Sequence, residues 1–288
     1  MSARKRLAWQ HLADRLFTGL CALGAGLALL PLCSLLWLVV RRGAPVLSLD
    51  LLTKLPGSAG EPLGGVGHAI AGTLLMVGLA CVIGLPAGIG AGVFLAERER
   101  HPVAEVVRFL AEVLAGVPSI VVGIAGYGLV VVWSKHFSAL AGALSLAFLM
   151  VPPLARGTEE VVRMVPSALR EAALALGVPE WVASLRVVLR TARGSIATVA
   201  LLAISRAAGE TAPLLFTALS NQYWNLDPTQ PTASLTVQIF NDATSPYDEW
   251  HQRAWGAALV LLLLVGGLNL LARRLAAASP TGVRMERR

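Results

Sequence analysis

Charged residues are scarce in this sequence. Asp, Glu, Lys and Arg make up only 14% of the 288 residues, whereas an average soluble domain is about 25% charged. Hydrophobic residues reach 56%, and the mean hydropathy is +0.68. A soluble globule of this size needs more polar surface to cover its core, and a disordered chain is far less hydrophobic. The composition therefore favours a protein that lies in a membrane.

Lysine, cysteine and histidine are also few, and their positions exclude several kinds of active site. None of the three lysines, Lys5, Lys54 and Lys135, follows a glycine, so the Gly-Lys-Ser/Thr sequence of a Walker A nucleotide site is missing. The three cysteines lie in apolar runs, and no pair of the five histidines has the spacing of metal ligands. We therefore expect no metal, no cofactor and no catalytic residue on this chain.

Six apolar runs are long enough to cross a bilayer, which needs roughly 20 apolar residues in a helix. The first run exceeds the hydrophobic region of a signal peptide, about 7–15 residues, so we interpret it as a retained span. The fourth is the shortest, and Pro152 and Pro153 obscure its end. The six runs are residues 17–40, 69–95, 109–132, 137–154, 196–219 and 254–272.

Runs this apolar leave no polar face for a bundle of soluble helices. The sequence predicts an all-α membrane protein with one six-helix transmembrane domain over residues 17–276. Short tails, 1–16 and 277–288, precede and follow this domain, and the longest loop covers residues 155–195.

The positions of the basic residues predict the orientation of the spans. With both termini placed inside, eighteen of the 24 Lys and Arg residues lie in the two tails and in the 96–108 and 155–195 loops, and five lie in the outer loops. Cytoplasmic segments carry the excess of Lys and Arg. We therefore expect a multi-pass protein of the inner (cytoplasmic) membrane with both termini in the cytoplasm. Nucleic acid is not expected as a partner, because the basic residues are spread over four segments and form no single face.

The 155–195 loop has the pattern of two helices separated by a glycine. Ser167 and Glu171 mark a short first helix, and Gly177 ends it as a left-handed C-terminal residue would. A second helix opens at Pro179 or Glu180. This pattern is typical of a docking element, and equally of an amphipathic hairpin lying on the membrane surface.

Glycines at four-residue spacing occur in the second apolar run. Gly84, Gly88 and Gly92 form two overlapping GxxxG patterns, which let two helices approach closely in lipid. The contact is either within this chain or with a partner chain.

Several segments resemble a known family. The string Glu171-Ala172-Ala173, followed after three residues by Gly177, is similar to the EAA loop of ABC importer permeases, although Arg190 stands where the family pattern has proline. The strings GGVGHAIAGTLLMV at 64–77, GVPSIVVGI at 116–124 and SRAAGETAPLLFTA at 205–218 resemble the phosphate permeases of this family. The resemblance extends from about Gly64 to the sixth run.

The resemblance implies a type I ABC importer permease that passes inorganic phosphate into the cytoplasm, driven by ATP hydrolysis on partner subunits. The implied partners are a homologous second permease in a heterodimer, two ATP-binding subunits, a periplasmic phosphate-binding protein and membrane lipid. In the family, the residues matching Glu171, Ala172, Ala173 and Gly177 couple the permease to the ATPase. Alternatives are a permease for another oxyanion or solute, an ATP-independent secondary transporter and a membrane enzyme.

One apolar run contains a charged pair. Arg206 lies ten residues after Ile196, which is about 15 Å along a helix and near the middle of a bilayer core about 30 Å thick. Glu210 lies at i+4, and Pro213 and Thr217 continue the same face. A buried ion pair that locks the bundle and a water-lined substrate path both fit this pattern. The resemblance favours a path lined by Arg206, Glu210 and Thr217, because similar permeases carry Arg and Glu in the matching segment.

Overall fold

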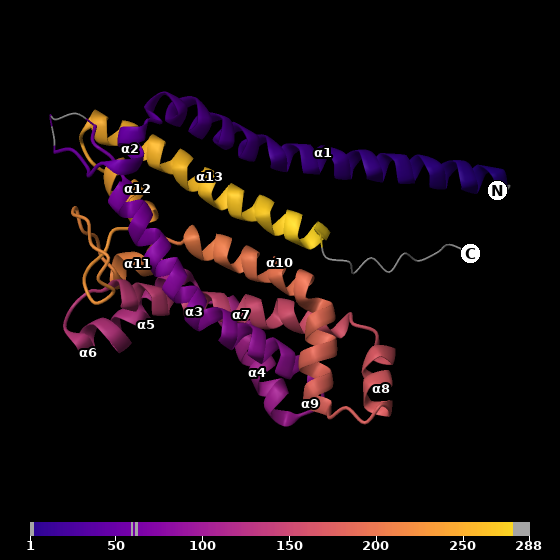
Figure 1. Cartoon of the computed structure of the whole chain (residues 1–288). Coiled ribbons are helices and arrows are strands. Elements are labelled where there is room, and N and C mark those ends of the chain that lie inside the picture. Colours follow the sequence, from indigo (N-terminus) through magenta and orange to yellow (C-terminus); the bar gives the residue numbers. More distant parts are fainter. Residues whose placement is uncertain (1–2, 59, 61–62, 279–288) are drawn as a thin grey trace.

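The computed structural model describes residues 3–58, 60 and 63–278 (Figure 1). The expected C-terminal tail, 277–288, lies outside the described residues from 279 onward. The described elements are α1 (Ala3–Gly43), η1 (Ala44–Val46), α2 (Leu49–Thr53), α3 (Gly67–Glu97), α4 (Pro102–Ala115), α5 (Ser119–Gly126), η2 (Tyr127–Val131), α6 (Val132–Ser134), α7 (Ala139–Arg163), α8 (Ser167–Ala175), α9 (Glu180–Val182), η3 (Ala183–Val188), α10 (Leu189–Ala208), α11 (Ala212–Thr217), α12 (Leu235–Ala243) and α13 (Asp248–Ala278).

Five described helices are long and apolar enough to cross a membrane, and a bent helix pair raises the number to six if it counts as one span. This confirms the predicted all-α membrane fold. The five are Asp14–Val46, Gly67–Glu97, Ala139–Arg163, Glu180–Ala208 and Asp248–Leu271.

The third predicted span, 109–132, is not one straight helix. The chain turns by 105° between α4 and the helical stretch Ser119–Ser134. Pro118 is the reason, because the residue before a proline is sterically driven away from the helical conformation. Pro118 itself has extended backbone, with ψ at 135°, and Gly116 caps α4 just before it.

The bounds of the fourth and fifth predicted spans are also wrong. Helix α7 passes through Pro152 and Pro153 and continues to Arg163. Membrane helices tolerate proline where neighbouring groups form hydrogen bonds with the backbone groups that the proline frees. The next span begins at Glu180 and ends at Ala208, so the predicted helix 196–219 is interrupted. Much of the predicted loop 155–195 is therefore helix that continues from the spans, and only residues 164–179 link them.

The spans run alternately between two ends of the molecule (Figure 1). The beginning of α1, the end of α13 and helix α8 lie toward the right of the view, and α2, α6 and α12 lie toward the left. The described ends of the chain therefore lie at the same end of the molecule as α8, and the short helices between spans gather at the opposite end.

Helices α3 and α7 form the centre of the core. Buried apolar side chains of both helices make one cluster with residues of α10, α11 and α12. The three glycines of the GxxxG pattern lie at this contact: a Cβ added at Gly88 would lie 2.5 Å from Leu154 Cβ, and one at Gly92 would lie 2.5 Å from the Ala155 carbonyl oxygen. The pattern therefore serves helix packing within this chain.

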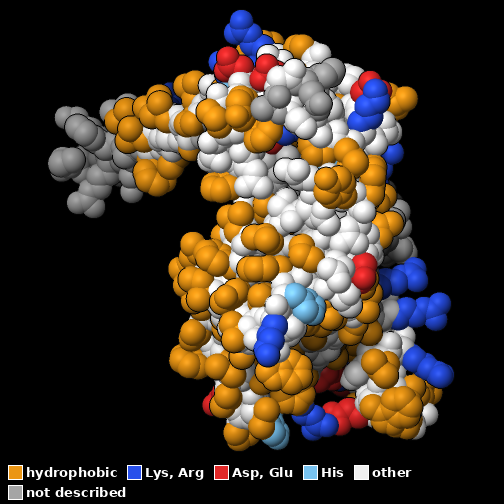
Figure 2. All heavy atoms as spheres, turned by 90° about the vertical axis from the view of Figure 1, so that its left-hand side faces the viewer, with side chains coloured by type: hydrophobic (Ala, Val, Ile, Leu, Met, Phe, Trp, Pro, Cys, Tyr) orange, Lys and Arg blue, Asp and Glu red, His pale blue; other side chains and the backbone are white. Residues whose placement is uncertain are grey.

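Hydrophobic side chains also cover much of the outside. Figure 2 shows them over the middle of the visible face, while charged side chains collect toward its upper and lower ends and its right edge. Only 6% of the apolar window of α1 is buried within the chain. Such an exposed apolar surface is what a lipid bilayer and partner chains would cover.

Candidate functional site

Helix α10 ends between Arg206 and Glu210, which the sequence analysis predicted to lie on one helix. Its last helical residue is Ala208, and Gly209, Glu210 and Thr211 separate it from α11. Arg206 Nε lies 3.6 Å from Glu210 Oε1, and the side chains are 62% and 17% exposed, respectively. The ion pair is thus loose, with the guanidinium open to its surroundings and the carboxylate mostly covered.

The break after α10 is held on two sides. The hydroxyl of Thr236 in α12 donates a hydrogen bond to the carbonyl oxygen of Glu210 at 3.0 Å. Helix α5 approaches from the other side so closely that a Cβ added at Gly123 would lie 2.7 Å from Pro213 Cα. These contacts fix the backbone at Glu210 and at Pro213.

Thr217 does not share the exposed face with Arg206. Its side chain is fully buried, and its hydroxyl donates to the Pro213 carbonyl oxygen at 2.7 Å. The expected polar stripe on one uninterrupted helix is therefore wrong, because the helix is broken at residues 209–211 and Thr217 is buried. The structure brings Arg206 and Glu210 together and leaves Thr217 inside the bundle.

A second candidate region is the link between α7 and α9. Helix α8 carries Glu171, Ala172 and Ala173, and Gly177 follows it with φ at +79°. The Gly177 N–H donates to the Leu174 carbonyl at 2.9 Å, and the Val178 N–H donates to the Ala173 carbonyl at 3.2 Å. This pair of bonds is the Schellman arrangement, in which a left-handed residue closes the helix end. The predicted helix, glycine break and second helix are confirmed.

The outward side of this link is apolar. Ala173 is buried, whereas Glu171 and Ala172 are exposed. The exposed large hydrophobic side chains of the segment are Met164, Leu169, Leu174, Leu176, Trp181 and Leu185. Charged side chains would cover such a surface if it only faced water, so the segment is suited to contact with another protein or with lipid.

Ion pairs attach this link to the turn between α3 and α4. Arg170 of α8 pairs with Glu97, and Arg98 lies 3.6 Å from Glu180 at the start of α9. Arg163 at the end of α7 lies 3.3 Å from Glu99. These pairs connect α8 and its flanking residues to the ends of α3 and α7 and to the start of the Glu180–Ala208 span.

Glu159 is the centre of a charged cluster that the sequence analysis missed. Its side chain is 2% exposed and accepts bonds from Arg108 of α4 at 2.9 Å and from Arg156 of α7 at 2.8 Å. Arg163 lies 2.8 Å from the same carboxylate. The spacing of Arg156, Glu159 and Arg163, at i+3 and i+4, is visible in the sequence and would have indicated a shared helix face. The contribution of Arg108, 51 residues away, would not have been.

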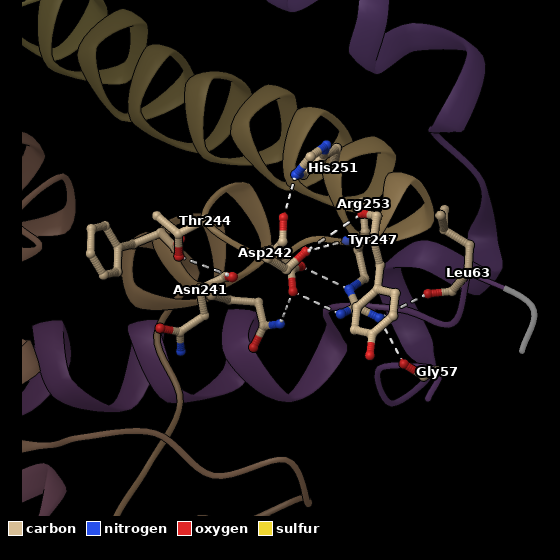
Figure 3. Close-up of polar contacts among 11 residues, drawn as sticks. Gly57, Leu63, Asn241, Asp242, Thr244, Tyr247, His251 and Arg253 are labelled. Atoms are coloured by element: carbon tan, nitrogen blue, oxygen red, sulfur yellow. Dashed lines mark hydrogen bonds and ion pairs between the residues drawn. The ribbon is translucent and has the colours of Figure 1, made fainter. Parts of the chain in front are cut away.

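A second buried pair fixes the opposite end of the molecule. Arg253 and Asp242 are each 2% exposed and make two hydrogen bonds of 2.8 and 2.7 Å (Figure 3). Arg253 also donates to the carbonyl oxygens of Gly57 and Leu63, at 3.2 and 3.1 Å. The sequence analysis counted Arg253 only among the basic residues of the outer loops. A hollow of about 340 Å³ lies beside the pair.

The loop between α11 and α12 is ordered by its own polar groups. Thr229 donates its hydroxyl and its backbone N–H to Asp227 Oδ1, at 2.7 and 2.8 Å. These bonds hold the pKa of the exposed Asp227 carboxyl below its ordinary value, because they favour the charged form. Within the described residues, no group of three or more His, Cys, Asp or Glu is placed to hold a metal ion.

Solved structures with this fold are transporters. The chain aligns over 96% of its length with 99% of a chain of a bacterial alginate ABC transporter, with a TM-score of 0.68 and 15% identity. It aligns over 75% of its length with 94% of a chain of the MetNI methionine ABC transporter, with a TM-score of 0.59 and 19% identity. At these identities the likeness concerns the fold. The chain thus has the fold of type I ABC importer permeases.

Sequence comparison places the chain more narrowly. The model of the family described as "binding-protein-dependent transport system inner membrane component" matches residues 88–285, and the chain belongs to this family. Curated relatives are named phosphate transport system permease protein PstA. The Yersinia pestis protein is 45% identical, covering 94% of this chain and 92% of its own length. The Haemophilus influenzae protein is 40% identical, over 93% of this chain and 95% of its own length. A probable PstA of Methanocaldococcus jannaschii is 36% identical, over 92% of this chain and 94% of its own length.

Proposed function

We propose that this chain is a permease subunit of an importer that moves inorganic phosphate into the cytoplasm, driven by ATP hydrolysis on partner subunits. The observation that carries the proposal is the open guanidinium of Arg206 at the broken end of a membrane helix, with Glu210 3.6 Å away. Phosphate as the substrate is supported by the names of relatives that match nearly the whole chain.

Arg206 and Glu210 have opposite effects on a passing anion. A guanidinium binds phosphate oxygens through charge-assisted, often bidentate hydrogen bonds. Glu210 competes for the same guanidinium and repels the anion, so the anion is attracted but not retained. Thr217 contributes to this path only by fixing α11, since its buried hydroxyl bonds to Pro213.

The segment around α8 docks on an ATPase subunit. Its exposed Glu171 and Ala172, the rigid turn at Gly177 and the apolar side chains beside them form the contact surface. The ion pairs to Glu97 and Glu180 carry nucleotide-driven motion to α3 and to the Glu180–Ala208 span. The assembly contains a second, homologous permease, two ATP-binding subunits and a periplasmic phosphate-binding protein. Both termini and α8 face the cytoplasm.

Uptake of radiolabelled phosphate by a strain that lacks its own importer permease tests this function. The strain expresses the partner subunits, with or without this chain. We expect uptake only with the chain, and no uptake when the partner ATPase carries a substitution that abolishes hydrolysis. Uptake that persists with the inactive ATPase would establish a secondary transporter instead.

Competition with other anions tests the substrate. A roughly tenfold excess of unlabelled phosphate should suppress uptake of the labelled phosphate. The same excess of sulfate or molybdate should not. Preferential competition by sulfate or molybdate would favour the alternative, a permease for another oxyanion.

A further inference from the structure

A hollow of about 350 Å³ lies between α1, α12 and α13, away from Arg206. Its walls combine basic and apolar groups. The basic side chains are Arg42 and His251, and the remaining lining residues are Ile239, Ala243, Ala254, Trp255 and Ala258. Neither the phosphate path nor the α8 contact uses these residues.

Arg42 is held in place but left without a counter-charge. Its guanidinium carbon lies 5.2 Å from the centre of the Trp255 ring, within the range of a cation–π contact. The following residue fixes this position, because a Cβ added at Gly43 would lie 2.7 Å from the Trp255 carbonyl oxygen. Among the described residues Arg42 has no ion pair and no hydrogen bond from its side chain, so its N–H donors are free.

The other groups at the hollow are consistent with an anionic ligand. His251 contributes its ring: one nitrogen, Nε2, lies 2.7 Å from the Ser245 carbonyl oxygen. Asp248 Oδ1 lies 3.8 Å from His251 Nδ1, and the Asp248 side chain is 99% exposed. A carboxylate surrounded by water is well screened and opposes an anion at Arg42 only weakly.

The position of the hollow identifies the source of the anion. Arg42 closes the apolar span Asp14–Val46, and His251 opens the span Asp248–Leu271, so both lie where a membrane-crossing helix meets the headgroup layer. Basic and Trp side chains at this level are typical interfacial anchors. The apolar lining residues extend from there along α13 toward the membrane interior. Free phosphate has no group to place against them, whereas a lipid has an acyl chain.

We propose that this hollow binds one anionic phospholipid, with its phosphodiester on Arg42 and an acyl chain against Ile239, Ala254 and Ala258. The lipid would connect α1 to the rest of the chain. This helix needs such a connection, because only 6% of its apolar window is buried, and its buried residues, Val39 and Gly43, lie near its end.

The test uses the assembled importer in nanodiscs of pure phosphatidylcholine or of phosphatidylcholine with phosphatidylglycerol. Thermal unfolding and bound lipid, counted by native mass spectrometry after gentle extraction, are measured for the wild type, Arg42→Ala and Arg42→Lys. The matched control is Arg41→Ala, because Arg41 is exposed in the same helical turn but does not line the hollow.

We expect phosphatidylglycerol to stabilise the wild type and Arg41→Ala, and Arg42→Ala to retain at least about tenfold less of it, since a charge-assisted bond is lost. Arg42→Lys should retain an intermediate amount. Equal losses in both alanine variants, or no loss in either, would overturn the proposal. So would stabilisation by free inorganic phosphate in phosphatidylcholine discs that Arg42→Ala abolishes and Arg41→Ala retains, since the ligand at Arg42 would then need no acyl chain.

Discussion

Arg206 lies in a different environment from the one that its position in the sequence suggests. A uniform helix over 196–219 would bury it midway through the bilayer, where an unpaired Arg costs at least about 2.5 kcal/mol. In the structure it lies in the last turn of α10, next to a break, and its side chain is 62% exposed. A charge in such a place needs water, a partner or a passing anion to compensate it.

The double variant Arg206→Met, Glu210→Leu tests whether this pair serves transport. Matched apolar replacements of a structural pair are often neutral. We expect normal assembly with the partner subunits but at least about tenfold slower phosphate uptake, because a hydrogen bond to a charged group contributes about 1.5–3 kcal/mol. Uptake of labelled phosphate and co-purification are the measurements.

The control for this variant is Lys54→Met, Asp50→Leu. This pair also has i,i+4 spacing, but both of its side chains are exposed. Asp50 lies in α2, and Lys54 directly follows the helix. It should leave uptake unchanged, since exposed pairs contribute little. Wild-type uptake by the Arg206, Glu210 double variant would identify that pair as purely structural.

At Gly177, the backbone conformation, rather than a lack of space, favours glycine. No atom lies within 4 Å of a Cβ added there, so a side chain would meet no obstacle, but φ is +79°. We expect Gly177→Val to cost about 1–2 kcal/mol at this turn. It should insert in the membrane normally and lose uptake and ATPase association.

Two further variants separate backbone strain from added bulk. Gly177→Asn should be milder, because Asn visits the left-handed conformation more readily. Ala175→Val adds bulk two residues earlier on an exposed position of α8 and should retain both activities. Full uptake and ATPase co-purification by Gly177→Val would disprove the docking role.

At the scale of elements, helices α4 and α7 are joined by charge as well as by packing. A single carboxylate, Glu159, holds Arg108 of α4 and both Arg156 and Arg163 of α7. Helix α4 is bent by 105° from the helix that follows, and its apolar contacts include a small cluster in which Ala104 packs with Leu95 and Ala155. The charged cluster fixes α4 against α7 close to the α8 link.

Glu159→Gln should therefore lower the thermal stability of the purified protein. The carboxylate is buried, while the three arginines are 21–40% exposed and are partly solvated. We expect the free energy of unfolding to fall by roughly 1–3 kcal/mol. The value should lie toward the lower end of this range, because the arginines are partly solvated. Glu160→Gln, at the adjacent exposed position, should change nothing. Equal unfolding temperatures for the two variants would show that the cluster does not hold α4.

At the scale of the whole molecule, the arrangement of the spans predicts what each side of the membrane can reach. In Figure 1, α8 and the described ends of the chain lie toward one side of the molecule, and the loop between α11 and α12 lies toward the other. Eighteen of the 24 basic residues fall, by sequence, in the two tails and in the 96–108 and 155–195 segments, so we expect the α8 end to be cytoplasmic.

Cysteine labelling in intact cells tests this topology. Leu226→Cys, on the exposed loop before α12, should react with an impermeant maleimide, and Ser167→Cys at the start of α8 should react only after the cells are opened. The unsubstituted chain, with its three native cysteines, provides the background. Labelling of Ser167→Cys in intact cells would reverse the orientation.

Local patterns were sufficient for much of this protein. Hydropathy runs predicted the membrane fold, because the bilayer requires about 20 apolar residues in sequence. The Schellman turn at Gly177 was predictable for a similar reason, since a helix end depends on a few consecutive residues. The glycines of α3 indicated close packing, although the identity of the partner helix was not readable from them.

Other features depend on residues that are distant in the chain. Arg108 meets Glu159, and Arg253 meets the backbone of Gly57, across 51 and 196 positions, and no spacing rule extends that far. The break after Ala208 was missed because the run 196–219 was taken as a whole to be long and apolar enough for one helix, whereas α10 ends at Ala208 and α11 begins at Ala212, where Gly123 and Thr236 contact the chain. Hydropathy records which residues enter the membrane, whereas the direction of the backbone within it is decided by neighbouring helices.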